Sequence, residues 1–414
     1  MREGEQESLM KRHHGLKRNK GWGGQRARET LRTKHINDST MRFTVSSTQL
    51  GSCLSNLSKV IATKNAMPIL NCFLFEVNGG ELTVTASDTE NVMKSSIPLD
   101  EYDCDGAFCL TSRTILDAIK ELAEQPVTVD VDLETLSTSI LYLNGVYNIV
   151  GLNAEDYPRN TPIQNDQRMF TITSETLAGS IARALFATAQ DELRPVMNGL
   201  FFDFKPEGLA IVATDGHKLV RSMVHNIAAD DIMGFILPKK PATLLKNVLK
   251  KDDSEVVIKF DTRNAEISFA GGCLICRLTE GKYPNYQTVI PVNNNNYITI
   301  NRRSLIGTLR RVLPFANDSS QLIRFKISSG KMEISSEDID FSTSAKEEVV
   351  CDYDGTPITI GFKGSTLTEV LNNLESEDVT FKLADEARAG IVIPSPQDEV
   401  VDILMLMMPM LLND

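Results

Sequence analysis

The feature that most constrains this chain is a long internal repeat. The segment FTVSSTQLGSCLSNL, which starts at Phe43, returns as FTITSETLAGSIARAL at Phe170 and as ITINRRSLIGTLRRV at Ile298, with spacings of 127 and 128 residues. A leucine holds the same place in each copy: Leu50, Leu177 and Leu305. Each copy reads as a short alternating strand, then a Ser, Thr or Asn at a helix start, then an amphipathic helix. The chain is therefore predicted to repeat one structural unit three times.

Two further signatures follow in the same order in every copy. The first ends a strand at an aspartate: Asp88 in ELTVTASD, Asp215 in GLAIVATD and Asp338 in KMEISSED. The second reads as strand, helix, acidic turn and strand: LTSRTILDAIKELAEQPVTVDVD, LPKKPATLLKNVLKKDDSEVVIKFD and IGFKGSTLTEVLNNLESEDVTFKL. We predict six helices, over 46–64, 111–124, 174–190, 239–251, 301–313 and 363–374. Two helices among many short alternating strands in each copy indicate an α+β fold with largely antiparallel sheets.

Polar segments divide the chain between the copies. Residues 161–168 (TPIQNDQR) and 291–296 (PVNNNN) are rich in Pro and Asn, as linkers are. We therefore predict modules over 41–160, 168–291 and 296–414. Residues 1–40 hold 10 Lys and Arg, 5 Asp and Glu and the only tryptophan, Trp22, without the apolar stretch of a signal peptide. They are interpreted as a disordered basic leader or an upstream extension before Met41, with a nucleic-acid-binding arm as the alternative.

Charge is distributed unevenly along the body. Without the leader, residues 41–414 carry a net charge of −17, which by itself argues against nucleic acid as a partner. The predicted helices nevertheless hold 15 Lys and Arg against 5 Asp and Glu, most clearly in PKKPATLLKNVLKK and NRRSLIGTLRR. Either these helices expose solvated basic faces, or they form a surface that contacts phosphates without reading bases. Because aromatic stacking platforms for single strands are missing from them, duplex DNA is favoured.

The sequence carries no recognisable catalytic motif. It contains no P-loop, dinucleotide fingerprint, HExxH or nucleophile elbow, and the body has only two histidines, His217 and His225. Seven irregularly spaced cysteines indicate reduced thiols, and the CxxC of Cys273 and Cys276 lacks the second pair that zinc requires. No apolar run approaches the roughly 18–20 residues of a membrane span. We expect a non-catalytic, cytoplasmic binding protein without cofactor or metal.

Short segments along the body match one known family. They are MRFTV at Met41, MPIL at Met67, SDTE at Ser87, LNAEDYP at Leu152, MNGLFF at Met197, VATDGHKL at Val212, YPNY at Tyr283 and MPM at Met408. Over essentially all of 41–414 the chain resembles the bacterial DNA polymerase III β subunits, the sliding clamps. The resemblance implies a head-to-tail homodimer whose six modules close a ring around double-stranded DNA. It also implies a processivity factor that tethers the replicative polymerase.

The resemblance further implies a groove between modules 2 and 3 that takes short apolar motifs. The proteins expected to bind in this groove are the DNA polymerase α subunit, the clamp loader δ subunit and other proteins that carry such a motif. The matching positions are Met197, Thr214, Gly216, His217, Lys218, Leu219, Pro284, Val289, Leu406, Met408, Pro409 and Met410, with Arg194 beside them. Methionines suit a groove with many partners, because the thioether chain repacks easily. In the apolar tail LMLMMPMLLND (404–414), the strand core is expected from Ile403 to Met405 and the docking surface after it.

Positions for the other two contacts follow from the same resemblance and from the predicted helices. The candidates for lining the DNA are Lys64, Arg113, Arg183, Lys239, Lys240, Lys246, Arg302, Arg303 and Arg310. Tyr147 and Phe315 match apolar residues of the subunit interface between module 1 of one copy and module 3 of the other. The chain departs from the family pattern at Leu411, where arginine is common, and at Lys218, where arginine is frequent. At Pro195 and Val196 it lacks the aromatic DNA contacts of some clamps.

Two other functions are considered beside the clamp. One is a metal-dependent enzyme of nucleic-acid repair that uses Asp215, Asp338 or Asp340, the last two in the acidic SSEDID (335–340). The other is a scaffold without a DNA role, in which the groove alone matters. Metal-dependent activity would favour the first, and indifference to charge reversal at Lys246 and Arg310 would favour the second.

Overall fold

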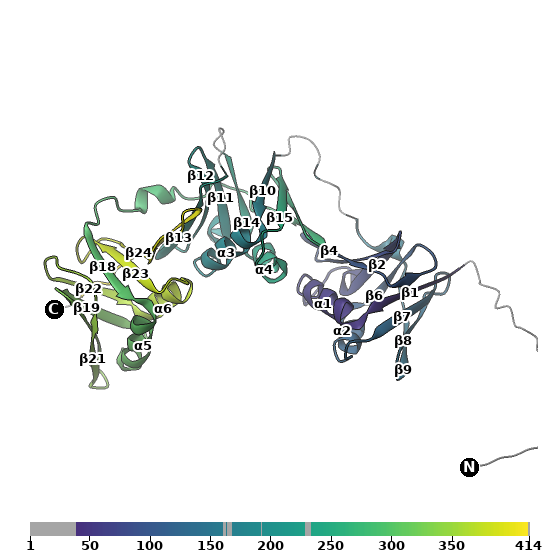
Figure 1. The fold of residues 1–414 in the computed structure, drawn as a ribbon, viewed down its shortest axis with the longest axis horizontal. Helices are drawn as coiled ribbons and strands as arrows, with labels where there is room; N and C mark the ends of the chain where they lie inside the picture. The colour runs from purple at the N-terminus through teal and green to yellow at the C-terminus, as the bar shows by residue number, and fades with distance from the viewer. Residues whose placement is uncertain (1–38, 160–162, 164–167, 192, 228–232, 413–414) are drawn as a thin grey trace, which may run out of the picture. The chain divides into compact units, whose positions relative to one another are not determined.

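The computed structural model describes residues 39–159, 163, 168–191, 193–227 and 233–412, and from Ser39 onward the chain forms one compact unit (Figure 1). The predicted leader up to residue 38 lies outside the described residues, as does most of the predicted 161–168 linker. We call the elements β1 to η2 module 1, β10 to η4 module 2 and β18 to β25 module 3. Residues 278–295, which follow β17 and include η4 at the end of module 2, are called the connector.

The three modules repeat one order of elements. Module 1 contains β1 Thr40–Ser46, α1 Ser47–Leu57, η1 Pro68–Asn71, β2 Cys72–Asn78, β3 Glu81–Ser87, β4 Asn91–Pro98, β5 Glu101–Tyr102, β6 Gly106–Thr111, α2 Ser112–Ile119, β7 Pro126–Asp132, β8 Ser137–Tyr142, β9 Gly145–Val150 and η2 Ala154–Asp156. Module 2 contains β10 Arg168–Thr173, α3 Ser174–Leu185, η3 Pro195–Asn198, β11 Gly199–Lys205, β12 Gly208–Thr214, β13 Lys218–Val224, β14 Met233–Pro238, α4 Lys239–Val248, β15 Glu255–Phe260, β16 Asn264–Phe269, β17 Gly272–Arg277 and η4 Tyr286–Val289. Module 3 contains β18 Asn296–Asn301, α5 Arg302–Val312, η5 Leu313–Phe315, β19 Leu322–Ser328, β20 Lys331–Asp338, β21 Thr343–Val350, β22 Ile358–Lys363, α6 Gly364–Asn372, β23 Asp378–Leu383, β24 Gly390–Ser395 and β25 Val401–Met407.

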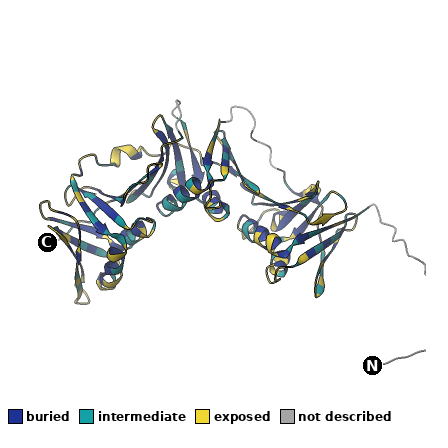
Figure 2. Ribbon diagram, viewed as in Figure 1, coloured by how far each residue is buried: buried dark blue, intermediate teal, exposed yellow. Residues whose placement is uncertain are grey.

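The repeated leucines are core residues on helices that start as predicted. The N-caps of α1, α3 and α5 are Ser46, Thr173 and Asn301, and each side chain accepts from the backbone N–H three residues on. Leu50, Leu177 and Leu305 are fully buried against the sheets, together with residues four and seven positions further along each helix. A leucine buried in this way contributes about 2 kcal/mol of transfer free energy. Figure 2 shows the buried faces of the helices turned toward the strands of their own module.

All six predicted helices exist, but the predictions were too long at the C-terminal ends. α1 ends at Leu57 rather than at 64, because Ser55 and Ser58 bond back to backbone carbonyls and the chain tightens into a turn. α4 ends at Val248, since Leu249 already has the extended backbone of a strand (ψ 132°). The basic residues that remain inside helices are concentrated in α4 and α5, which contain no acidic residue.

Two of the four sheets run across module boundaries. In the first eight-stranded sheet, β17 of module 2 pairs antiparallel with β4 of module 1. In the second, β25 of module 3 pairs antiparallel with β13 of module 2. The remaining sheets have five strands, ending at β9, and four strands, ending at β21. The modules are therefore joined by continuous hydrogen-bonded sheets.

Candidate functional site

The C-terminal tail has a buried part and an exposed part. β25 is buried, and its backbone follows β13 from Val401 opposite Val224 to Met407 opposite Lys218. Beyond it, Met408 is 47% exposed and Leu411 is 83% exposed. The strand core extends to Met407, two residues further than predicted, and an exposed segment follows it as expected.

A cavity of about 330 Å³ lies between this tail and module 2. Its lining comes from three segments: Asp215, His217 and Lys218 after β12, Phe362, Lys363 and Thr366 at the β22–α6 corner, and Met407 to Met410 in the tail. The tail is held on both sides, because the Met408 N–H donates to the His217 carbonyl (2.9 Å) and the Met410 N–H donates to Gly361 (2.8 Å). Five predicted groove residues, His217, Lys218, Met408, Pro409 and Met410, therefore line one cavity.

The loop between β12 and β13 is held by hydrogen bonds to the side chain of Asp215. Its carboxylate accepts from the N–H groups of His217 and Lys218, both at 2.9 Å, and pairs with the Lys218 ammonium at 2.9 Å. Burial alone would raise the pKa of Asp215, but these bonds outweigh it and lower the pKa. Gly216 completes the loop with φ of 92°, a conformation that favours glycine.

Lys218 ties the two modules together. Besides Asp215, its ammonium pairs with Glu369 of α6 at 3.6 Å and lies 5.8 Å from the ring centre of Phe186. The side chain is only 13% exposed. Its charge is therefore paired with carboxylates of the chain itself, at the boundary between modules 2 and 3 beside the cavity.

The other predicted groove residues lie around this cavity in different settings. Leu219 and Leu406 face each other across β13 and β25 and are buried in a cluster that also contains Tyr283, Ile391 and Leu404. Met197 is buried beside Gly216, and Arg194 lies on the same side and pairs with Asp191 at 2.8 Å. The N–H of Thr214 donates to the Tyr283 hydroxyl. Val289 is exposed, and Pro284 lines a second cavity, of about 570 Å³, with Phe201, Tyr283 and Tyr286.

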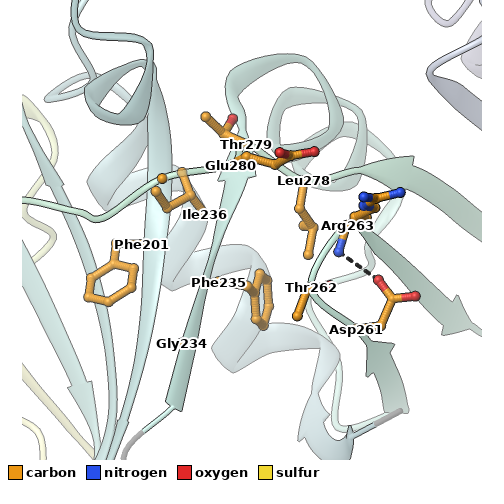
Figure 3. A pocket seen from close by; sticks show the side chains of 11 residues that line it. Phe201, Gly234, Phe235, Ile236, Asp261, Thr262, Arg263, Leu278, Thr279 and Glu280 are labelled. Atoms are coloured by element: carbon orange, nitrogen blue, oxygen red, sulfur yellow. Dashed lines mark hydrogen bonds between the residues drawn. The ribbon is translucent and has the colours of Figure 1, made fainter. Parts of the chain in front are cut away.

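A third cavity, of about 260 Å³, contains none of the predicted residues. Figure 3 shows Phe201 and Ile236 on one side of it and Asp261, Thr262 and Arg263 on the other, with Leu278 to Glu280 of the connector above. It lies along β14, away from the tail.

Several residues at or beside the cavity were not predicted as groove residues. They are Asp215, Phe362, Lys363, Thr366, Met407, Tyr283 and Ile391. Phe362 and Lys363 lie where the helix predicted over 363–374 begins, but nothing in that position indicated that the tail would lie beside them. Nothing local marked Ile391, because its neighbour Leu406 becomes adjacent only through the β24–β25 pairing.

The predicted DNA-lining residues divide into exposed cations and cations already engaged within the chain. Lys64, Lys246, Arg303 and Arg310 are exposed and make no ion pair with any described residue. Lys239 is half-buried at the start of α4, and Arg113 is 92% exposed in a loose pair with Asp117 (3.9 Å).

Two of these residues have hydrogen-bond partners within the chain instead, and a third is folded against its own helix. Lys240 donates to Asp88 and to the Val60 carbonyl in module 1. Arg302 donates to the carbonyls of Ser376 and Leu371, and so holds the end of α6. Arg183 folds back over Gly179 and is half-buried, and the loss of solvent around it lowers the pKa of its guanidinium. Helix position alone could not reveal these partners.

The two predicted interface residues lie near the edge strands β9 and β21. Tyr147 is on β9 and stacks on Tyr142, with ring centres 4.8 Å apart. Phe315 is partly exposed at the end of η5, beside β21. Other apolar side chains are exposed around the same two edges: Val146, Val150 and Leu152 near β9, and Ile339, Phe341 and Val350 near β21.

The repeated aspartates are turn residues. Asp88 accepts from the N–H groups of Glu90 and Asn91, Asp215 does so from His217 and Lys218, and Asp338 does so from Asp340 and Phe341. Within the described residues, no group of three or more His, Cys, Asp or Glu is arranged to hold a metal ion. Turn geometry therefore explains why an aspartate ends the strand in all three copies. Cys273 and Cys276 lie on β17.

Comparisons with known proteins agree with this architecture. Three family models match in sequence: DNA polymerase III beta subunit, N-terminal domain over 41–162, central domain over 171–285 and C-terminal domain over 287–410. The beta sliding clamp of Pseudomonas aeruginosa is 27% identical over 368 residues, covering 89% of this chain and all of that protein. That of Chlamydia muridarum is 25% identical over 376 residues, covering 90% and 100%.

Solved structures give the same result. The P. aeruginosa clamp bound to griselimycin superposes with a TM-score of 0.84 at 27% identity, covering 90% of this chain and all of that one. The beta subunit of Thermotoga maritima gives 0.80 at 25% identity with the same coverage. The fold and the site define a DNA sliding clamp, a class of non-catalytic processivity factors. The chain belongs to the DNA polymerase III beta subunit family. Among the described residues, every helix is too short or too polar to cross a membrane.

Proposed function

We propose that two copies of this chain close head to tail into a ring around duplex DNA, and that the groove at the tail tethers the replicative polymerase to it. The observation that carries the proposal is the pattern of strand pairing. Inside the chain, the last strand of one module pairs with the strand after the aspartate turn of the preceding module, as in β17 with β4 and β25 with β13. β9 is a last strand and β21 is a strand after the turn, and each lies at the edge of its sheet with no further neighbour among the described strands.

Pairing β9 of one copy with β21 of the other would complete the pattern. The exposed apolar side chains beside both edges, together with Tyr147 and Phe315, would then be covered. Because β9 and β21 belong to different modules, the contact is heterologous, and it closes when the second copy returns to the first. Six modules then alternate around the ring without a free edge of this kind.

Sequence-independent contacts to DNA are assigned to the exposed cations of the helices. Lys246 on α4 and Arg303 and Arg310 on α5 are the strongest candidates, with Lys64 after α1. Lys and Arg bind phosphates without reading bases, and such contacts exchange quickly. The ring retains the DNA topologically, while these contacts allow it to slide.

The docking groove is inferred to run from the tail cavity across Leu219 toward Pro284 and Val289. Its methionines, together with Phe362, Leu219, Pro284 and Val289, suit short apolar motifs, such as those of the polymerase α subunit and the clamp loader δ subunit. Domain boundaries at 41–160, 168–291 and 296–414 and a cytoplasmic location belong to the same proposal.

The ring makes a direct prediction about strand β9. In β17, which is equivalent to β9, the Arg277 N–H donates across the module boundary to Glu90. We therefore expect the N–H groups of Val146, Asn148 and Val150 to point away from β8, toward the open edge of the sheet. We expect the native chain to sediment as a dimer and Asn148→Pro to sediment as a folded monomer, because proline removes the outward N–H. Asn148→Ala keeps that N–H and should remain dimeric. A native chain that is monomeric at micromolar concentration would contradict the ring.

A further inference from the structure

The motif YPNY (283–286) lies in the connector. Its two tyrosines contact module 2 at two places, Tyr283 at Thr214 at the end of β12 and Tyr286 at Asp203 on β11. We propose that Tyr283 and Tyr286 are positioning residues that fix the connector as one wall of the docking groove. The inference rests on the proposed docking function and deepens it, since it says what holds Pro284 and Val289 in place.

Tyr283 joins the connector to the loop that lines the tail cavity. Its ring is buried and stacks on Phe201, with ring centres 4.8 Å apart and planes 11° from parallel. Its hydroxyl accepts a hydrogen bond from the buried N–H of Thr214 at 3.1 Å. A buried backbone N–H without a partner costs free energy, so this hydroxyl stabilises the end of β12 directly.

Thr214 passes this constraint on to the groove. Its side-chain hydroxyl donates to the Lys218 carbonyl at 2.7 Å and accepts from the Gly216 N–H at 3.1 Å. The same loop accepts the tail through the His217 carbonyl and the Met408 N–H. The connector, the β12–β13 loop and the tail are therefore linked by consecutive hydrogen bonds.

Tyr286 anchors the connector at a second point. Its hydroxyl donates to the Asp203 carboxylate at 2.7 Å, and Lys205 pairs with the same oxygen at 3.2 Å. The Lys205 ammonium also lies 5.0 Å from the centre of the Tyr286 ring. Asp203 and Lys205 both have side chains only 12% exposed, so this triangle of three side chains is shielded from water.

The two anchors enclose Pro284 and precede Val289. Pro284 follows Tyr283 directly, and η4 begins at Tyr286 and ends at Val289. Both tyrosines line the 570 Å³ cavity that Pro284 also lines. Val289 is more than half exposed, so we infer that the two anchored tyrosines determine the position of this wall of the groove.

The test compares single-atom changes. Tyr283→Phe removes the acceptor for Thr214 and keeps the stacked ring, and Tyr286→Phe removes the donor to Asp203 and keeps the ring beside Lys205. Tyr353→Phe is the matched control, because that buried hydroxyl bonds to Thr356 and Asn296 in module 3. Binding of a fluorescein-labelled peptide that carries the apolar docking motif of a DNA polymerase III α subunit is measured by anisotropy on the full dimeric chain. Hydrogen exchange of the segment 211–219 is followed in parallel.

We expect the dissociation constant of the peptide to rise about tenfold for Tyr283→Phe and about threefold for Tyr286→Phe, where the Asp203–Lys205 pair survives. Exchange in 211–219 should accelerate for Tyr283→Phe, and Tyr353→Phe should change neither quantity. Wild-type affinity in Tyr283→Phe would overturn the inference, as would equal weakening in Tyr353→Phe. If the native chain does not bind the peptide, the docking function itself fails, which is a separate outcome.

Discussion

The two junctions inside the chain use the same backbone frame and differ in what fills it. At the first junction the Arg277 N–H donates to Glu90 (3.0 Å), and at the second the Met408 N–H donates to His217 (2.9 Å). Two residues later, the Thr279 N–H donates to Ile236 (3.0 Å) and the Met410 N–H to Gly361 (2.8 Å). The segments after β17 and β25 therefore cross the two junctions in the same way, and we call each of them the crossing segment.

The side chains close the first junction and leave the second open. Lys240, the second residue of α4, reaches Asp88 and the Val60 carbonyl of module 1. The second residue of α6 is Ser365, which is too short to do this, and Asp215 pairs with Lys218 of its own loop. The crossing segment differs as well, because Arg277 pairs with Glu280 (3.4 Å) where the tail has Met408 and Leu411.

This difference explains why a docking groove forms at one junction of a repeated structure. At the first junction the Lys240–Asp88 ion pair joins the helix to the aspartate turn, and Arg277 and Glu280 make the crossing segment polar. At the second junction the ion pair runs instead from Lys218 to Glu369, and the crossing segment is apolar. At the same backbone positions the tail has Met408 and Leu411, both exposed, and Met408 lines the cavity between modules 2 and 3. A few side-chain differences on the same backbone arrangement therefore explain why the docking groove lies at the second junction.

Removal of the tail should have the largest effect. Truncation of Met408–Asp414 deletes one wall of the cavity but leaves β25 in its sheet. We expect the chain to remain a folded dimer and to lose binding of the labelled motif peptide, with affinity reduced at least a hundredfold. Unchanged anisotropy titrations would refute the assignment of the groove. Circular dichroism and sedimentation provide the control for folding.

Charge reversal on the helices should have the next largest effect. Lys246→Glu with Arg310→Glu replaces two exposed cations of α4 and α5. Since each phosphate contact adds to the salt-dependent affinity, we expect the residence time on DNA to fall about tenfold and the slope of log affinity against log salt to decrease by roughly 2. Lys326→Glu, on the exposed face of β19, is the matched control and should leave both unchanged. Equal residence times for all variants would favour the scaffold without a DNA role.

The first junction offers a smaller effect on stability. Lys240→Ala removes the bonds to Asp88 and Val60 and should cost about 1 kcal/mol, at the low end for a charged hydrogen bond because Lys240 is 39% exposed. Burial alone would raise the pKa of Asp88, but bonds from Lys240 and Asn91 lower it. The pair therefore stabilises the fold above the ordinary aspartate pKa of about 3.9, and the gain is lost as the pH falls through the lowered folded value. Thermal unfolding at pH 7 and pH 3 should differ less in Lys240→Ala than in the native chain.

The same comparison shows what the sequence could predict. The helix starts, the repeated leucines and the aspartates at strand ends depend on residues within a few positions of each other, and all three were predicted from the pattern. The role of Lys240 depends on Asp88, 152 residues away, so its place on a basic helix suggested DNA instead. Helix ends were overestimated where Ser55 and Ser58 compete for backbone carbonyls. Long-range pairing likewise explains why Ile391 and Tyr283 were missed.

The central claim is that the chain holds DNA by encircling it. The direct measurement is to load the protein onto nicked circular DNA with a bacterial clamp loader and ATP, cut the circle once, and follow release by gel filtration. We expect stable retention on the circle and rapid loss once the DNA has ends, because a ring can slide off a linear molecule. Equal retention on circular and linear DNA, or none on either, would contradict the account.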